Sequence, residues 1–182
     1  MNTPVITILS FGRFEREFLE KISEVVMHEF NSTVTIKEAH LDISEFYDPG
    51  RRQYNGDKLL KVVDAMNGSD YSKKIGLFSV DLFIPILTYI FGQAQLGGRT
   101  AIASQFRLSN ERYGMSPDEE LMTERFIKEV VHELGHTFGL IHCHTPTCVM
   151  RSSTYVEDID QKEMRLCVRC REMIELTNQN QI

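Results

Sequence analysis

The chain has 182 residues, of which 42% are hydrophobic and 25% are charged, a composition typical of one globular domain with an ordinary core. Twenty Lys and Arg residues against 26 Asp and Glu residues give a formal net charge of −6, which disfavours binding to nucleic acid. The first residues contain no basic segment, and Ser10, Gly12 and Arg13 interrupt their apolar run, so we expect neither a signal peptide nor a membrane anchor. These features predict a cytoplasmic protein that does not bind membranes.

The first part of the chain alternates between strand and helix patterns. Residues 5–9 and 33–37 are short β-branched runs typical of strands, and the apolar residues between them recur at helical spacing. A right-handed crossover would make these two strands parallel. Residues 40–56 are polar and predict a surface loop, and an amphipathic helix over residues 59–66 should then end at Asn67-Gly68.

Three further strand patterns follow. Residues 74–80 continue the alternation of strand and helix, which favours an α/β fold. The strands expected at residues 87–93 and 99–106 flank Gly97-Gly98, a two-residue connection that can join only antiparallel neighbours. One strand of the sheet should therefore run against the others.

Two helices are predicted in the last third of the chain. Ser116, followed by Pro117 and by Glu119 three positions after the serine, is typical of a capped helix start. An apolar stripe continues this helix toward Gly139, a residue type that often ends helices. The charged tail over residues 158–176 carries another apolar stripe, which predicts a last helix that is docked through its cysteines.

The segment from His132 to His142 has the spacing of a catalytic metal site. On a helix, His132 and His136 lie one turn apart on the same face, so both imidazoles can bind one metal ion. Glu133 follows the first histidine and can act on a metal-bound water as a general base. Gly139 can adopt a positive φ and return the chain so that His142 becomes the third ligand, which leaves a fourth position for water. The alternative is that the helix histidines make ordinary hydrogen bonds.

The four cysteines form a second group of candidate ligands. They lie within 28 residues of one another, and Cys143 with Cys148 and Cys167 with Cys170 make two close pairs. Two close pairs separated by a spacer match a structural zinc site with four thiolates. Two disulfides or free thiols are the alternative, although a reducing compartment disfavours disulfides. Because His142 and Cys143 are neighbours, the two metal sites should be mechanically linked.

With Met150 included, the whole pattern resembles the archaemetzincin family of the metzincin clan. The family pattern is HExxHxxGxxH followed by Cys, x4, Cys, x, Met, a spacer of about seventeen residues and CxxC, and this chain differs by one residue in the spacer. The resemblance implies one metzincin-like catalytic domain over residues 1–182, with a twisted mixed sheet, an antiparallel edge strand and a central active-site helix. Residues 143–182 would form a small subdomain stabilised by the cysteine-bound zinc. Met150 would be the apolar floor beneath the catalytic metal, whereas its spacing alone indicates a core residue.

The motif and the resemblance together favour a zinc metallopeptidase. It would hydrolyse peptide bonds with a zinc-bound water and Glu133 as general base, and it would bind two zinc ions, one catalytic and one structural. Its partner would be a peptide or protein substrate, held by the edge strand through β-augmentation. Tyr113 and Tyr155 are candidates for stabilising the oxyanion, and both endopeptidase and aminopeptidase action fit the motif. The alternative is a non-catalytic zinc-binding or peptide-binding module that keeps the fold.

Overall fold

The computed structural model describes residues 4–66 and 72–179, and its centre is a mixed five-stranded sheet. The strand order is β2-β1-β5-β8-β7. The strands β1 (Val5–Phe11), β2 (Thr33–Ala39), β5 (Ser72–Phe78) and β8 (Thr100–Ser104) are parallel to one another, as the crossover argument predicts. The edge strand β7 (Gly92–Ala94) pairs antiparallel with β8, so the one reversed strand is confirmed.

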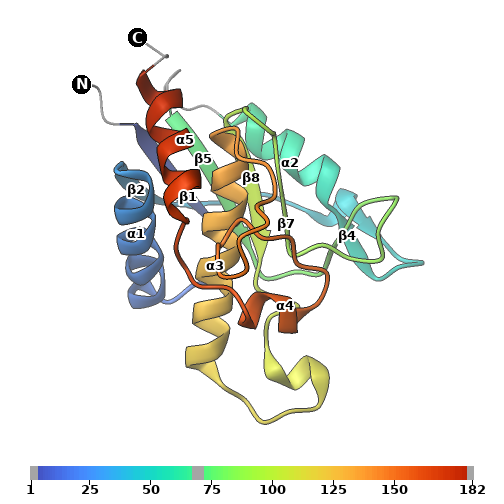
Figure 1. Ribbon diagram of the computed structural model, residues 1–182. Coiled ribbons are helices and arrows are strands. Elements are labelled where there is room, and N and C mark those ends of the chain that lie inside the picture. The colour runs from blue at the N-terminus through green and yellow to red at the C-terminus, as the bar shows by residue number, and fades with distance from the viewer. Residues whose placement is uncertain (1–3, 67–71, 180–182) are drawn as a thin grey trace.

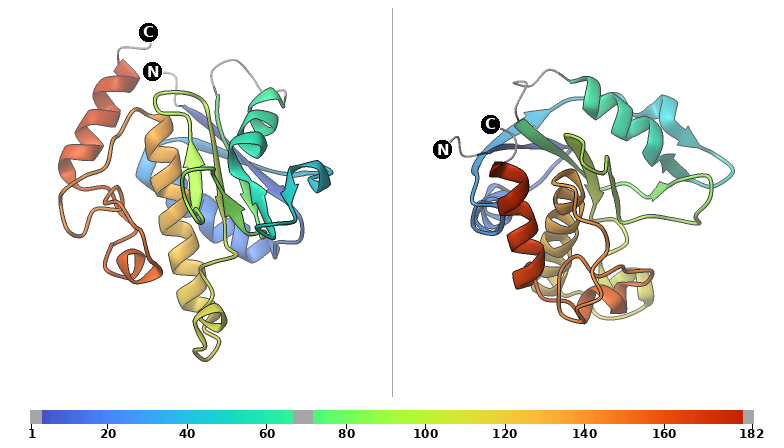
Figure 2. Two further views of the ribbon diagram at one scale, coloured as in Figure 1. Left: turned by 90° about the vertical axis from the view of Figure 1, so that its right-hand side faces the viewer. Right: turned by 45° about the horizontal axis from the view of Figure 1, so that its top comes forward.

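Helices cover both faces of this sheet. Figure 1 shows α1 (Arg16–Phe30) and α3 (Glu119–Thr137) on one face and α2 (Gly56–Ala65) on the other. The last helix, α5 (Val168–Gln179), contacts α1 and lies on the same side of the sheet as α3, which both views of Figure 2 also show. No helix within the described residues is both long enough and apolar enough to cross a membrane.

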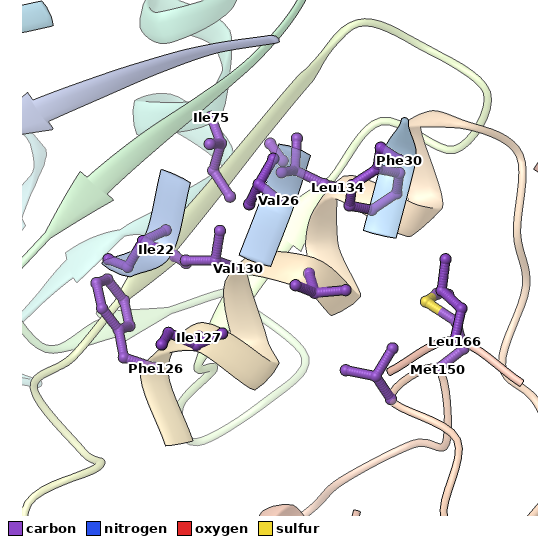
Figure 3. Packing of buried hydrophobic residues seen from close by; sticks show 14 of the residues in the cluster. Ile22, Val26, Phe30, Ile75, Phe126, Ile127, Val130, Leu134, Met150 and Leu166 are labelled. Carbon is purple, nitrogen blue, oxygen red and sulfur yellow. The ribbon is translucent and has the colours of Figure 1, made fainter. Parts of the chain in front are cut away.

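The core is divided by the sheet into two layers. Side chains of β1 alternate between these layers, as those of any strand do. Ile6 and Ile8 pack in the layer beneath α1 and α3, and Leu9 and Phe11 pack in the layer beneath α2. Figure 3 shows the larger layer, where apolar residues of α1 face those of α3. The labelled residues of these two helices are Ile22, Val26, Phe30, Phe126, Ile127, Val130 and Leu134. Helix α3 is therefore held on a rigid support.

The ends of α3 are fixed by two different residues. Its N-cap is Asp118, whose side chain accepts a hydrogen bond from the backbone N–H of Leu121, so the predicted cap at Ser116 is wrong by two positions. Aspartate is an equally good cap, and its charge also suits the positive end of the helix dipole. At the other end the helix stops at Thr137, and Gly139 has φ +87°, which confirms that this glycine redirects the chain.

The polar segment over residues 40–56 contains more order than a surface loop. It includes the short 3-10 helix Ser44–Phe46 and the strands β3 (Tyr47–Asp48) and β4 (Gln53–Asn55), which form a small second sheet with β6 (Leu82–Phe83). These strands have two or three residues each, too few to show a hydrophobic alternation. Helix α2 begins at Gly56, because the side chain of Asn55 caps it by accepting from Lys58 N. The predicted end of this helix, Asn67-Gly68, lies outside the described residues.

The region around the edge strand also differs from the prediction. The strand expected at residues 87–93 is limited to β7, apart from a single bridge between Ile90 and Leu82. The connection to β8 spans residues 95–99 and so is longer than the predicted two-residue turn. The buried Lys73 donates hydrogen bonds to Gly98 O (2.7 Å) and Thr137 O (2.8 Å), which fixes this connection to the end of α3.

The C-terminal tail forms two helices where one was predicted. Helix α4 (Val156–Asp160) ends eight residues before α5 starts, and the intervening chain returns beside the segment that follows α3. A backbone hydrogen bond from Val149 N to Arg165 O (3.0 Å) joins the two segments. The 3-10 helix Asn110–Tyr113 precedes α3. Residues 161–167 are not helical, so the predicted single helix over residues 158–176 is wrong.

Candidate active site and metal centres

The three predicted histidine ligands meet at one point beside α3. His132 and His136 lie one turn apart on the helix, with 3.2 Å between their Nε2 atoms. The chain reverses at Gly139 and brings the His142 ring to 5.3 Å from the His132 ring and 5.1 Å from the His136 ring, between centroids. One nitrogen from each of the three side chains lies within 4.8 Å of the others.

Hydrogen bonds orient the two helix histidines. The Nδ1 of His132 lies 2.8 Å from Val149 O, and the Nδ1 of His136 lies 2.7 Å from Leu140 O. With Nδ1 donating to a carbonyl, each ring presents a free Nε2 lone pair toward the other, the arrangement that metal-binding histidines adopt. Burial lowers the pKa of His132 well below its usual range and also lowers the pKa of His136. Both rings are therefore held neutral, as metal binding requires.

Glu133 is buried beside this histidine cluster. Its carboxyl group lines the same cleft, and only 6% of the residue is exposed. Burial raises the pKa of Glu133 well above its usual range, and the neighbouring carboxylate of Glu129 adds to the effect. A carboxyl group with a raised pKa next to a possible metal site is a candidate for accepting and returning a proton.

Gly92 of β7 makes room for this carboxyl group. A Cβ atom at this position would lie 2.6 Å from Glu133 Cγ and 2.7 Å from Ile102 O, so any other residue would displace either the glutamate or the sheet. This role was missed in the sequence. A glycine inside a strand pattern is, however, a recognised sign of close approach by another part of the structure.

The four cysteines form a compact cluster between the segment after α3 and the start of α5. Their Sγ atoms lie within 4.8 Å of one another, with Cys143 and Cys167 3.8 Å apart and Cys148 and Cys170 also 3.8 Å apart. A tetrahedral zinc ion with Zn–S bonds of about 2.3 Å separates its sulfur ligands by about 3.8 Å, so the cluster fits such an ion. All four thiols are free, and these distances are well above that of a disulfide bond.

The pKa values of the thiols in the cysteine cluster are shifted in different directions. Burial would by itself raise the pKa of Cys143, but hydrogen bonds from Thr145 hold it at about 7. Burial raises the pKa of Cys148 and of Cys170. The metal-free cluster therefore contains one thiol that ionises near neutral pH beside two that resist ionisation, and a bound cation would favour the thiolate form of all of them.

Met150 lies beneath the turn of α3 that carries the histidines. It is fully buried, and its Sδ and Cε atoms are the nearest neighbours that a Cβ atom at Gly135 would meet. The backbone N–H of Cys143 donates to Met150 O (2.9 Å), which joins Met150 to the first cysteine. His132 donates its orienting hydrogen bond to Val149, the residue before Met150. One short segment therefore serves both groups of candidate ligands.

A cleft of about 650 Å³ opens over the histidines and Glu133. The edge strand β7 and the segment before it line this cleft, together with Ile141 and residues 153–155. Tyr155 lines the cleft, whereas the hydroxyl group of Tyr113 donates to Arg107 O (2.8 Å) and this tyrosine does not line it. His144 is exposed and is not part of the histidine cluster.

A buried ion pair adjoins the cleft. Lys162 Nζ lies 3.4 Å from Glu129 Oε1, and the two side chains are 0% and 4% exposed. Lys162 also donates to Arg151 O (3.1 Å), and Glu129 lines the cleft. Neither residue was identified from the sequence. Glu129 could have been, because it precedes Glu133 by four positions and so lies on the same face of α3.

Comparison with known proteins agrees with this site. Residues 40–176 match the model of peptidase family M54. An archaemetzincin from Methanopyrus kandleri is 40% identical over 164 residues, which cover 90% of this chain and 85% of that protein. The crystal structure of that archaemetzincin superimposes with a TM-score of 0.85 at 35% identity, and the match covers 97% of this chain and 96% of that chain. The structure of a zinc-dependent peptidase from Methanocorpusculum labreanum matches with a TM-score of 0.83 at 28% identity, over 93% of this chain and 99% of that chain. The chain therefore belongs to peptidase family M54, and the predicted resemblance to the archaemetzincins and their metzincin-like fold is confirmed.

Proposed function

We propose that the chain is a zinc-dependent peptidase that hydrolyses peptide bonds in the cleft over α3, with Glu133 as general base. The observation that carries this proposal is the convergence of three imidazoles beside a buried carboxyl group in an open cleft. A purely structural metal site has no use for such a carboxyl group, and this argues against a module that only binds zinc or peptide.

His132, His136 and His142 would hold the catalytic zinc, and the four cysteines would hold a structural zinc. When bound, the catalytic ion lowers the pKa of a water molecule and polarises the carbonyl group of the scissile bond. Three protein ligands leave a coordination position open, whereas four thiolates close the second site. The cysteine site would stabilise residues 143–182 as a small subdomain.

Glu133 would take the proton from the attacking water and pass it to the amine that leaves. Its position against Gly92 places the carboxyl group at the wall where the substrate backbone would lie. Burial raises the pKa of Glu133, which favours the protonated form that would act as the acid in the second step. His132 and His136 would keep their orientation throughout, because backbone carbonyls fix both rings.

An extended substrate would pair with β7. This strand is the edge of the sheet, and its backbone groups face the cleft on the side away from β8. β-Augmentation would supply backbone hydrogen bonds that do not depend on the substrate sequence, and the side chains lining the cleft would supply the specificity. Peptides or proteins with an accessible extended segment are the expected substrates.

The test separates metal binding from catalysis. Glu133→Ala should keep both zinc ions and lose peptidase activity, because the base is not a ligand. His132→Ala should lose the catalytic zinc and keep the cysteine-bound ion, so its zinc content should fall from two to one per chain. The measurements are metal analysis by mass spectrometry and turnover of a peptide library. Activity that survives in Glu133→Ala would refute the proposed role of Glu133.

A further inference from the structure

Two exposed apolar residues, Leu96 and Ile141, line the cleft that contains the histidines. They are 62% and 65% exposed. Leu96 lies in the connection between β7 and β8, and Ile141 directly precedes His142. A single exposed apolar residue is common on a protein surface, but exposed apolar residues that line one cleft are typical of a binding site.

The segments that carry these two residues meet at one backbone carbonyl group. His136 O accepts a hydrogen bond from Gly97 N at 2.8 Å and another from Gly139 N at 3.0 Å. Gly97 directly follows Leu96, and Gly139 precedes Ile141 by two positions. Both apolar residues are therefore within two residues of a bond to the same turn of α3, the turn that carries the second histidine.

The backbone of both segments is fixed by further interactions. Gly97 has φ +65° and Gly139 has φ +87°, so each segment turns at a residue that tolerates the left-handed region. The buried Lys73 donates to the carbonyl groups of Gly98 and Thr137, which ties the connection to the end of α3 a second time. With the backbone held in this way, little entropy beyond that of the two side chains is lost when a ligand packs against them.

Few charged residues line this cleft. Among the described residues that do, the only acidic or basic ones apart from the histidines are Glu129 and Glu133. Glu129 is already paired with Lys162, and Glu133 is the proposed general base. A charged substrate side chain would lose water without gaining a partner, whereas an apolar one is stabilised by covering Leu96 and Ile141. The surroundings of these two residues therefore favour an apolar substrate residue.

The direction of the edge strand indicates which part of the substrate reaches this pair. Gly92 packs against Glu133, and Leu96 follows Gly92 by four residues, so the chain runs from the general base toward Leu96. Antiparallel pairing is the more stable way to add a strand to β7, and it directs the N-terminal part of the substrate toward Leu96 and Ile141. Four residues of extended chain span about 13 Å, so the substrate residue at this pair lies within about four positions of the scissile bond.

We propose that Leu96 and Ile141 form a subsite for an apolar side chain of the substrate, on the N-terminal side of the scissile bond and within about four residues of it. This inference rests on the proposed peptidase function. The two residues then determine specificity by contacting the substrate away from the reacting atoms. The substrate class is peptides in which an extended segment carries a large aliphatic or aromatic residue before the bond that is cut.

Two variants test this subsite against a matched control. Leu96→Ser and Ile141→Ser each remove an exposed apolar side chain, and neither change touches the backbone groups that hold the two segments. Ile86→Ser is the control, because Ile86 is also apolar and is 86% exposed but does not line the cleft.

Two measurements are made on each zinc-loaded protein. The first maps cleavage positions by mass spectrometry in a peptide library that carries Leu, Ser or Lys at successive positions. The second measures the affinity for peptides that end in a hydroxamate, in which this zinc-binding group takes the place of the scissile bond and the varied residues precede it. Each preference is a ratio between two peptides on the same protein, so it does not depend on the fraction of the protein that holds zinc.

We expect the wild type and Ile86→Ser to favour Leu over Ser by about tenfold at one position before the scissile bond, and to favour Leu over Lys by more. Leu96→Ser and Ile141→Ser should each reduce the preference for Leu by about three- to fivefold, in cleavage and in affinity. The inference would be overturned if the wild type showed no such preference, or if the preference were as strong in Leu96→Ser as in Ile86→Ser. A preference in hydroxamate affinity without cleavage of any peptide would instead refute the proposed function and support the subsite.

Discussion

Gly135→Ala should destabilise the protein, although Gly to Ala inside a helix is usually favourable. Gly135 lies within α3, between the two helix histidines, and is buried. A Cβ atom there would overlap Met150 Sδ and would lie 3.0 Å from Met150 Cε, closer than these atoms can pack. Met150 is fully buried, so its flexible side chain can move away only by displacing neighbouring core atoms.

The expected magnitude follows from two opposing effects. Helix propensity favours alanine by about 1 kcal/mol, whereas overpacking a core position costs about 1–3 kcal/mol. We therefore expect the free energy of unfolding to fall by about 1 kcal/mol. Displacement of Met150 would also shift the carbonyl of Val149 that orients His132, so the affinity of the histidine site for zinc should fall.

Urea unfolding of zinc-loaded Gly135→Ala, together with competition for zinc by a chelator, measures both effects. The double variant Gly135→Ala/Met150→Ala is the control, because it removes the atoms that clash. Truncation of Met150 should cost less in the Gly135→Ala variant than in the wild type, which gives a coupling between the two sites. If Gly135→Ala is instead more stable than the wild type by about 1 kcal/mol, Met150 does not pack under the histidine turn as described.

Two further variants test the charges and ligands of the site. Cys167→Ser should lower the melting temperature more than Glu133→Gln, because it removes one of the four thiolates that would hold the structural zinc. Equal melting of both variants and the wild type would disprove a structural zinc. In metal-free protein, Glu133→Gln should gain stability over the wild type as the pH rises above about 4.5, where an unfolded glutamate loses its proton. The sign follows because burial raises the pKa of Glu133, so the folded wild type binds a proton that the unfolded chain has released and loses stability with rising pH. Urea midpoints of both proteins between pH 4 and 8 measure this difference, and parallel pH curves would contradict it.

The sequence predicted those parts of the site that depend on local geometry. His132 and His136 share a face of α3 because any helix places positions i and i+4 together, and Gly139 reverses the chain with a positive φ that glycine tolerates. The grouping of the four cysteines could be predicted without knowing the fold, because the ligands of one metal ion must lie close together whatever path the chain takes between them. Their grouping was therefore predictable, whereas the break between α4 and α5 was not.

Contacts between distant segments could not be predicted in this way. Lys162 reaches Glu129 across 33 positions, and Tyr89 reaches Thr154 across 65, with no periodic pattern to indicate either contact. The polar character of Lys162 even suggests an exposed residue, and only the tertiary structure shows why its charge is buried. Such contacts depend on how the chain after α3 packs against this helix, and local sequence patterns do not determine this packing.

The segment between Gly139 and Met150 explains why the two candidate metal centres are joined. It carries His142, the third candidate ligand of the catalytic metal, offers Val149 O to orient His132, and carries Cys143 and Cys148. A backbone hydrogen bond from Cys143 N to Met150 O closes this segment into a loop, so it cannot bend without moving both groups of candidate ligands. A zinc ion held by the cysteines would fix this segment before the catalytic ion binds, and the entropy of ordering His142 would then already be lost. The histidine site should accordingly bind zinc more weakly whenever the cysteine site is empty, even though the two sites share no ligand.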